Sequence, residues 1–267
     1  IISLVPTVAR LLLERIEATG ANCPSLRAMT ATGEAFPVSL KERLALALPH
    51  VGLWVFYGMT EGGIPAVLRP DEQSLKPTSV GRPMPGVEIR LTDESGMDVE
   101  TGQTGEVLLR SGVPGQAMVA REYFNRPEAN GEAYKDGWFR TGDVGRFDED
   151  GYLYLVDRVK DMILSGGLNV YSREVEQALE AAPAVREVAV VAGPDPDFGE
   201  CVVAYVALKP GQAATAEELI AHCRDYIAGY KKPKYLFCLD DLPRNVNGKV
   251  VKAELRERAA RDIKNAG

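Results

Sequence analysis

The chain has 267 residues, of which 45% are hydrophobic, so it is long enough for one large domain or two smaller ones with packed cores. Its formal net charge of -7 argues against a surface for nucleic acid or anionic membranes, and any phosphate binding must therefore be local. Pro6, Arg10 and Glu14 interrupt the apolar opening, so we expect neither a signal peptide nor a transmembrane segment.

Residues 1–75 alternate helix and strand patterns. Apolar residues recur with helical spacing between Val8 and Ile16, and residues 39–48 form a second predicted helix. Residues 26–32 and 51–56 are predicted strands, the second of them buried. This alternation is typical of an α/β fold.

Residues 80–157 show a different pattern. Short alternating stretches at 86–93, 105–111 and 151–158 are separated by Gly, Pro and Asp turns. The pattern predicts an antiparallel, barrel-like subdomain that closes the first domain, and the texture changes again after Lys160. We therefore predict two domains, 1–159 and 160–267.

The second predicted domain is a compact α+β unit. Ser172 is the expected N-cap of a helix whose apolar residues lie between Val175 and Ala182. Strands are predicted over 185–192, 201–208 and 235–239. Thr215 and Glu218 form a capping-box pair for a helix through residue 227, with Gly229 as its stop, and a charged helix follows from about Lys252.

The four cysteines form no CxxC pair, and with only two histidines no zinc-ligand spacing is present. Cys201 and Cys238 lie in apolar runs and Cys223 on a predicted helix face, which favours buried free thiols over disulfides. We therefore expect no structural metal and a cytoplasmic location.

Four segments carry the chemical signal: YGMTE at 57–61, GWFRTGD at 137–143, DRVKDMILSGGLNVYSREVE at 157–176 and LPRNVNGK at 242–249. Together and in this order they resemble motifs of adenylate-forming enzymes, the acyl-CoA synthetase and AMP-binding superfamily. The resemblance covers nearly the whole chain but only the second half of a family member. It implies the C-terminal part of a large nucleotide-binding domain followed by a small mobile α+β domain.

The first motif offers an aromatic ring for a base, a hydroxyl for a phosphate and a carboxylate for Mg2+. The resemblance implies that Tyr57 stacks on adenine beside Gly58, that Thr60 contacts the α-phosphate, and that Glu61 coordinates Mg2+. Alone, five residues fit a strand ending in a glycine turn equally well. The loop TATGEAFP, with Gly33 and Glu34, resembles the family's small-residue loop beside adenine, although ordinary strand-to-helix turns have the same composition.

The remaining motifs supply groups for ribose, hinge motion and the thiol substrate. By resemblance, Asp143 accepts hydrogen bonds from the ribose hydroxyls, and Arg158 contacts a ribose oxygen or a phosphate. The alternative without a ligand is a surface ion pair at the strand ends. Lys160 corresponds to the family's hinge position but also fits a solvated linker lysine. The resemblance places the Gly166–Gly167 turn beside the pantetheine tunnel.

Lys249 follows Asn247 and Gly248, a tight-turn pair that would present its ammonium at a loop tip. In the family this lysine stabilises the charge that develops during adenylation. Without its surrounding motif it would be read as an exposed loop lysine.

These resemblances imply a carboxylic acid–CoA ligase that uses ATP, Mg2+ and CoA and acts on a fatty, other acyl or aryl acid. A module that passes its acyl group to a carrier protein and a non-catalytic nucleotide- or CoA-binding module are the alternatives. No phosphate loop rich in Ser, Thr and Gly occurs in these residues, so we expect an N-terminal portion of the parent enzyme to be missing and this piece alone to be inactive. Ser172 stands where relatives carry proline, and the loop over 111–128 is longer than usual.

Overall fold

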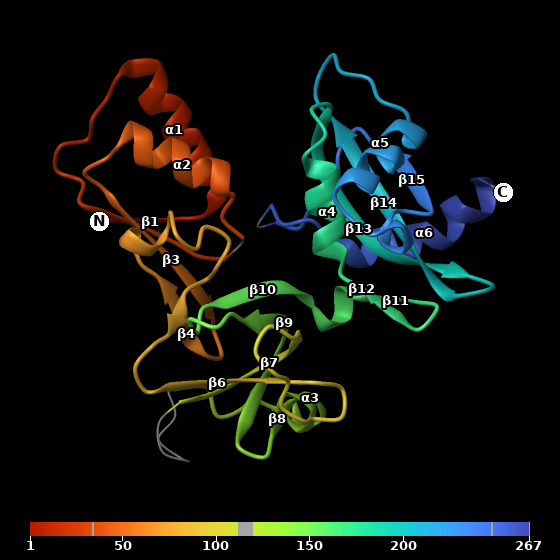
Figure 1. The fold of residues 1–267 in the computed structure, drawn as a ribbon, viewed down its shortest axis with the longest axis horizontal. Helices are drawn as coiled ribbons and strands as arrows, with labels where there is room; N and C mark the ends of the chain where they lie inside the picture. The colour runs from red at the N-terminus through yellow and green to blue at the C-terminus, as the bar shows by residue number, and fades with distance from the viewer. Residues whose placement is uncertain (34, 112–119, 247, 267) are drawn as a thin grey trace. The chain divides into compact units, whose positions relative to one another are not determined.

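The computed structural model describes residues 1–33, 35–111, 120–246 and 248–266 (Figure 1). The chain folds into two compact units, Ile1–Leu155 and Val156–Gly267. Glu34 and Asn247, both singled out above, lie outside the described residues, as does most of the long loop that follows Ser111. Among the described residues, no helix has both the length and the apolar composition needed to cross a bilayer.

The first unit begins with a five-stranded sheet of order β1-β2-β3-β4-β5. Strands β1 (Ile2–Leu4), β2 (Ala28–Ala31) and β3 (Gly52–Met59) are parallel, whereas β4 (Gly63–Leu68) and β5 (Arg82–Pro83) run antiparallel to their neighbours. The predicted α/β pattern is confirmed, but β1 and β4 were not predicted from the sequence. A short 3-10 helix, Pro70–Glu72, follows β4.

Helices α1 (Pro6–Thr19) and α2 (Val38–Ala47) pack together beside this sheet (Figure 1). Helix α1 starts with Pro6 at its first position, where a missing N–H costs nothing, and ends at Gly20 in the left-handed conformation. The buried side chains beneath the two helices include Leu13, Met29 and Leu44. This core fixes the position of β3, which carries the first motif.

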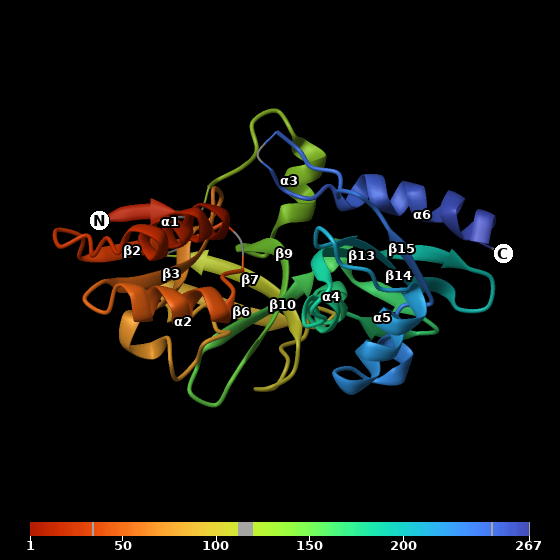
Figure 2. The same cartoon turned by 90° about the horizontal axis from the view of Figure 1, so that it is seen from above.

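A second, antiparallel sheet completes the first unit. Its order is β10-β9-β7-β6, so that β7 (Gly105–Ser111) lies between β9 (Trp138–Phe147) and β6 (Val87–Thr92) (Figure 2). Strand β10 (Leu153–Arg158) borders β9, as does the short β8 (Tyr134–Lys135), which follows α3 (Pro127–Ala133). The predicted antiparallel subdomain is therefore confirmed. Its core includes Tyr57, so β3 contributes to both cores of the unit.

The second unit is built on a sheet of order β12-β11-β14-β13, with β15 parallel to β14. Its strands are β11 (Ile163–Ser165), β12 (Leu168–Val170), β13 (Val185–Asp195), β14 (Gly199–Leu208) and β15 (Tyr235–Cys238). Its helices are α4 (Ser172–Glu180), α5 (Ala216–His222) and α6 (Lys252–Ala266), with short 3-10 turns at Val159–Asp161, Cys223–Asp225 and Gly229–Lys231.

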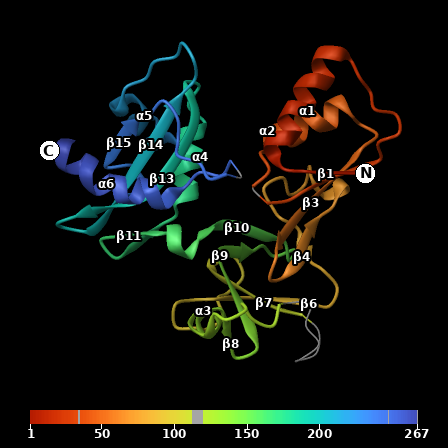
Figure 3. The same ribbon diagram turned by 180° about the vertical axis from the view of Figure 1, so that it is seen from behind.

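Both faces of this sheet are covered, which explains the continuous apolar runs of its long strands. On β13, Val188 and Val190 face the core formed with α4 and α5, whereas Ala189 and Val191 face the core formed with α6. The contact between α6 and β13 can be followed in Figure 3. Between Val188 and Ala192 the side chains alternate between two buried faces, and this stretch of the strand contains no polar residue.

Two predictions about helix ends were wrong. Ser172 is the first residue of α4 and not its N-cap, because the Asp157 carboxylate accepts the Arg173 N–H at 3.4 Å and the Ser172 hydroxyl at 3.1 Å. The predicted Thr215 capping box is present. However, α5 ends at His222, and Gly229 begins a separate 3-10 turn without a positive φ.

The cysteine prediction was partly wrong. All four thiols are free, and Cys201 and Cys223 are buried as expected. Cys238 is exposed, because it is the last residue of β15, which pairs with β14 alone.

Candidate functional site

The structure brings Tyr57 and Asp143 into direct contact. The Tyr57 hydroxyl donates a hydrogen bond to Asp143 Oδ2 at 2.7 Å, although the two residues are 86 positions apart. Tyr57 lies within β3 and is only 6% exposed, and the motif covers the end of that strand and the start of the turn that follows it. The Tyr57 hydroxyl and the Asp143 carboxylate therefore form a hydrogen-bonded pair at the junction of the two sheets.

Asp143 is oriented by its neighbours on the antiparallel sheet. Its N–H donates to Thr141 Oγ1 at 3.0 Å, and the Thr141 hydroxyl donates in turn to the Val107 carbonyl oxygen at 2.8 Å. Thr141 is buried, so this connection is protected from water. These bonds fix the backbone at Asp143, and the Tyr57 hydroxyl orients its carboxylate, which can then accept hydrogen bonds from paired hydroxyl groups with little reorganisation.

The β3–β4 hairpin presents the rest of the YGMTE segment. A side chain at Gly58 would come within 2.8 Å of the Gly63 carbonyl oxygen, so the hairpin closes only with glycine there. Thr60 is exposed at the turn, and Glu61 is half-buried beside it. The turn of this hairpin therefore carries one hydroxyl and one carboxylate at adjacent positions.

Tyr123 contacts the Glu61 side chain, although the sequence motifs did not single it out as a site residue. Its hydroxyl donates to Glu61 Oε1 at 2.7 Å. Burial and then the Glu61 carboxylate raise the pKa of Tyr123 to about 12, so the phenol remains a donor at neutral pH. The sequence pattern drew attention to this segment only through its length, because a contact spanning 62 positions leaves no local signal.

The chemistry of this corner fits a Mg2+ ion that is shared with nucleotide phosphates. The described residues contain no cluster of three or more His, Cys, Asp or Glu side chains that could hold a metal. Mg2+ is commonly bound by one or two carboxylates together with phosphate oxygens and water, so Glu61 alone is a sufficient protein ligand. Among the described residues, its Oε2 atom accepts no hydrogen bond.

Gly33 lies in the loop after β2 and has a φ of +91°, a conformation that side-chain-bearing residues rarely adopt. Glu34, which was singled out together with Gly33, lies outside the described residues.

Arg158 and Lys160 belong to the second unit, at its start. Both side chains are exposed. The Arg158 N–H donates to Asp157 Oδ1 at 2.8 Å, and the Lys160 carbonyl oxygen accepts from Arg256 of α6 at 2.9 Å. The backbone around the predicted hinge is therefore held within the second unit, whose first residue is Val156.

Gly166 and Gly167 form the two-residue turn between β11 and β12, with φ values of +58° and +81°. Two successive positive φ angles are what a tight primed hairpin turn requires. A side chain on Gly166 would also meet the Phe198 ring at 2.9 Å. The predicted glycine turn is thus confirmed as a turn, with the half-exposed Phe198 ring beside it.

Lys249 lies in a small hairpin that is closed by a bridge between Arg244 and Val250. Its N–H donates to Asn245 Oδ1 at 3.0 Å, and its carbonyl oxygen accepts the Asn245 N–H at 2.9 Å. The side chain is exposed, and Gly248 has the positive φ expected of the turn. Local hydrogen bonds therefore hold the backbone of Lys249 in place, and its side chain extends from the hairpin at an exposed position.

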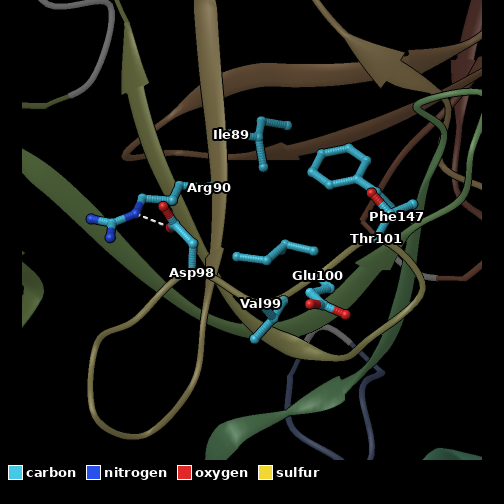
Figure 4. Close-up of a pocket in the computed structure, with 8 residues that line it drawn as sticks. Ile89, Arg90, Asp98, Val99, Glu100, Thr101 and Phe147 are labelled. Carbon is cyan, nitrogen blue, oxygen red and sulfur yellow. Dashed lines mark hydrogen bonds and ion pairs between the residues drawn. The ribbon is translucent and has the colours of Figure 1, made fainter.

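Two hollows among the described residues are lined by other side chains. One of about 260 Å³ lies between β6 and residues 98–101 (Figure 4). Its wall includes the Arg90–Asp98 ion pair and Phe147. Tyr57 and Asp143 instead meet at the junction of the two sheets of the first unit.

Comparison with known proteins supplies the context for this geometry. Residues 1–124 match the model for the AMP-binding enzyme family, and residues 174–249 match the model for the AMP-binding enzyme C-terminal domain. The chain is 40% identical over 257 residues to a feruloyl-CoA synthase of Amycolatopsis sp, covering 95% of this chain and 50% of the relative. It is 36% identical over 259 residues to a fatty acid–acyl-carrier-protein ligase of Streptomyces coeruleorubidus, covering 96% and 49%.

Among solved structures, o-succinylbenzoate CoA synthetase from Bacillus subtilis, in complex with its acyl-adenylate intermediate, superposes with a TM-score of 0.84. It is 34% identical in sequence, with 95% of this chain and 50% of that chain covered. The chain thus spans about half the length of the curated relatives it matches.

Proposed function

Because this chain belongs to the AMP-binding enzyme family of adenylate-forming enzymes, we propose that it is part of an AMP-forming carboxylic acid–CoA ligase. In the first half-reaction a carboxylate oxygen attacks the α-phosphorus of ATP and pyrophosphate leaves. In the second, the thiol of CoA attacks the acyl carbon and AMP leaves. The reaction therefore needs residues that bind the nucleotide, groups that stabilise negative charge on its phosphates, and a path by which the thiol reaches the acyl carbon.

The observation that carries this proposal is the hydrogen bond between Tyr57 and Asp143. This bond joins the motif at residues 57–61 to the motif at residues 137–143, and it places the Tyr57 ring beside the oriented Asp143 carboxylate. In the proposed complex the Tyr57 ring contacts adenine beside Gly58, and Asp143 accepts the ribose hydroxyls. Gly33 and Glu34 would border the same nucleotide.

Thr60 and Glu61 are assigned to the phosphates. The Thr60 hydroxyl donates to an α-phosphate oxygen, and Glu61 is the protein ligand of Mg2+. The metal ion, when bound, neutralises phosphate charge. The half-buried position of Glu61 next to exposed Thr60 supports this assignment, because both groups reach solvent from one hairpin.

The second unit is assigned the groups that change between half-reactions. Arg158 contacts ribose or phosphate, Lys160 marks the hinge, and the Gly166–Gly167 turn borders the pantetheine arm of CoA. Lys249 supplies positive charge to the carboxylate and phosphate during adenylation. The exposed ammonium on a hydrogen-bonded hairpin supports this role, since such a group can be desolvated by a ligand.

Lys249→Ala, made in the full natural chain that contains these residues, tests the proposal. Pyrophosphate exchange should fall by at least about a hundredfold, as for loss of one group that stabilises transition-state charge. Thioester formation from supplied acyl adenylate and CoA should be nearly unchanged. Lys264→Ala, an exposed lysine on α6, is the matched control and should leave both half-reactions intact. Equal loss of both half-reactions would remove Lys249 from its proposed role.

We further propose that residues 1–267 alone are inactive, because relatives are about twice this length. Thioester synthesis by the isolated chain would contradict this. A fatty, other acyl or aryl acid is the proposed substrate, and a panel of such acids assayed by AMP release from the full enzyme would identify it. The free thiols support a reducing compartment, and we propose the cytoplasm.

A second candidate is transfer of the acyl group to a carrier protein, which the similarity to the carrier-protein ligase favours. Competition between CoA and a phosphopantetheinyl carrier protein for the same acyl adenylate distinguishes the two acceptors. A non-catalytic binding module would bind ATP or CoA by calorimetry but show no pyrophosphate exchange.

A further inference from the structure

We propose that Tyr123 is a positioning residue for the metal-binding carboxylate of Glu61, an inference that rests on the function proposed above. The Tyr123 hydroxyl occupies Glu61 Oε1 at 2.7 Å and thereby determines which carboxylate oxygen faces the ligand. The chemical class of that ligand is a divalent cation bound to nucleoside triphosphate oxygens.

Glu61 is fixed from two directions by one segment of chain. Besides the side-chain bond from Tyr123, the Ala120 N–H donates to the Glu61 carbonyl oxygen at 2.6 Å. Both contacts come from the residues that follow the long loop after Ser111. This segment therefore acts on the backbone and the carboxylate of the β3–β4 turn together.

Tyr123 is itself held in place. Its N–H donates to Asn130 Oδ1 at 2.6 Å, and Asn130 Nδ2 donates back to the Tyr123 carbonyl oxygen at 2.9 Å. Its ring meets the Tyr134 ring edge-on, with centroids 6.2 Å apart, and Tyr134 packs on Phe139 at 5.1 Å. A phenol held by backbone and ring contacts loses little further entropy when it orients a carboxylate.

Orientation matters because a half-buried glutamate otherwise samples several rotamers. With a donor on Oε1, Oε2 is the more open of the two carboxylate oxygens to a metal, because among the described residues it accepts no hydrogen bond. Groups that hydrogen-bond to metal ligands typically change metal affinity by about 10- to 100-fold when removed. Tyr123 has the geometry of such a group, although it would not touch the metal or the reacting atoms.

The test uses the full natural chain and Mn2+ as the probe, with binding measured by electron paramagnetic resonance in the presence of a non-hydrolysable ATP analogue. Tyr123→Phe keeps the ring but removes the donor, and it should weaken Mn2+ binding by about tenfold or more. The Mg2+ concentration for half-maximal pyrophosphate exchange should rise by the same factor. Mn2+ affinity within twofold of wild type would overturn the proposal.

Tyr134→Phe is the matched control, because its buried hydroxyl has no hydrogen-bond partner among the described residues. Its Mn2+ affinity should stay within twofold of wild type, and a loss equal to that of Tyr123→Phe would overturn the proposal by assigning the effect to packing. Adding Tyr123→Phe to Glu61→Gln should produce no further loss, whereas additive losses would show that Tyr123 does not act through Glu61.

Glu61→Gln alone separates this inference from the proposed function. If Glu61→Gln leaves Mn2+ affinity unchanged, the metal-binding role of Glu61 fails and the inference fails with it. If Glu61→Gln weakens binding while Tyr123→Phe does not, only the inference fails.

Discussion

Lys252→Met should destabilise the second unit selectively. Lys252 is the first residue of α6, and its ammonium lies 2.7 Å from Glu176 Oε1 and donates to Ser172 Oγ at 2.7 Å. Ser172 passes the connection on to the Asp157 carboxylate, at the start of the unit. One lysine thus joins α6, α4 and the segment that leads into the unit, three positions after Lys249.

The size of the effect follows from the burial of Glu176. That residue is 4% exposed, and without Lys252 its carboxylate would keep the Val190 N–H at 3.0 Å and Arg173 at 3.5 Å. Removing one partner of a buried ion pair typically costs 3–5 kcal/mol, and the remaining donors reduce this to about 3 kcal/mol. Lys252→Met/Glu176→Gln should recover part of the loss, since the unpaired charge is then absent.

The two units can be followed separately in denaturant. Both tryptophans, Trp54 and Trp138, lie in the first unit, so their fluorescence reports that unit. Amide hydrogen exchange in α4 and β13 reports the second. Lys252→Met should lower the exchange free energy of α4 and β13 without moving the tryptophan transition, whereas the control Lys264→Met should change neither. A loss below about 1 kcal/mol would refute the argument that the buried Glu176 charge depends on Lys252.

Two further predictions concern the first unit. Burial alone would raise the pKa of Asp148, but hydrogen bonds from Lys76, the Tyr152 N–H and Tyr154 lower it to about 2. Its stabilising contribution is therefore complete above the unfolded value near 4 and is lost as pH falls through about 2. Asp148→Asn should flatten the acid dependence of the urea midpoint measured by tryptophan fluorescence, and an unchanged slope would contradict this. Gly81→Ala would place a methyl group 1.8 Å from the Val67 carbonyl oxygen at a φ of +96° and should cost about 3 kcal/mol, whereas Gly102→Ala, with positive φ but open space, should cost much less.

Local patterns predicted the elements that carry their own signal. The helix with apolar residues from Val175 onward, the long apolar strands β13 and β14, and the Thr215 capping box all appeared as expected. Each depends on spacing within a few residues, so the sequence contains the complete information. The order of the four motifs likewise identified the family, because motif text does not depend on knowing the contacts.

Predictions that depended on distant partners were incomplete or wrong. Serine is a common N-cap residue, yet the Asp157 carboxylate accepts the Arg173 N–H at the start of α4. The Ser172 hydroxyl instead donates to Asp157 and accepts from Lys252. Strand β1 has only three residues and β4 contains Pro65, and neither was predicted, since their stability comes from pairing with neighbours and not from their own pattern.

The amino-acid sequence by itself determined the family, because four motifs of that family stand in its order along the chain. Only the tertiary structure decided which side chains meet. The hydrogen bonds from Tyr57 to Asp143 and from Tyr123 to Glu61 join residues 86 and 62 positions apart. The first contact arises where the two sheets of the first unit pack together, and the second where the segment before α3 reaches the β3–β4 turn, so neither leaves a sign in the local sequence.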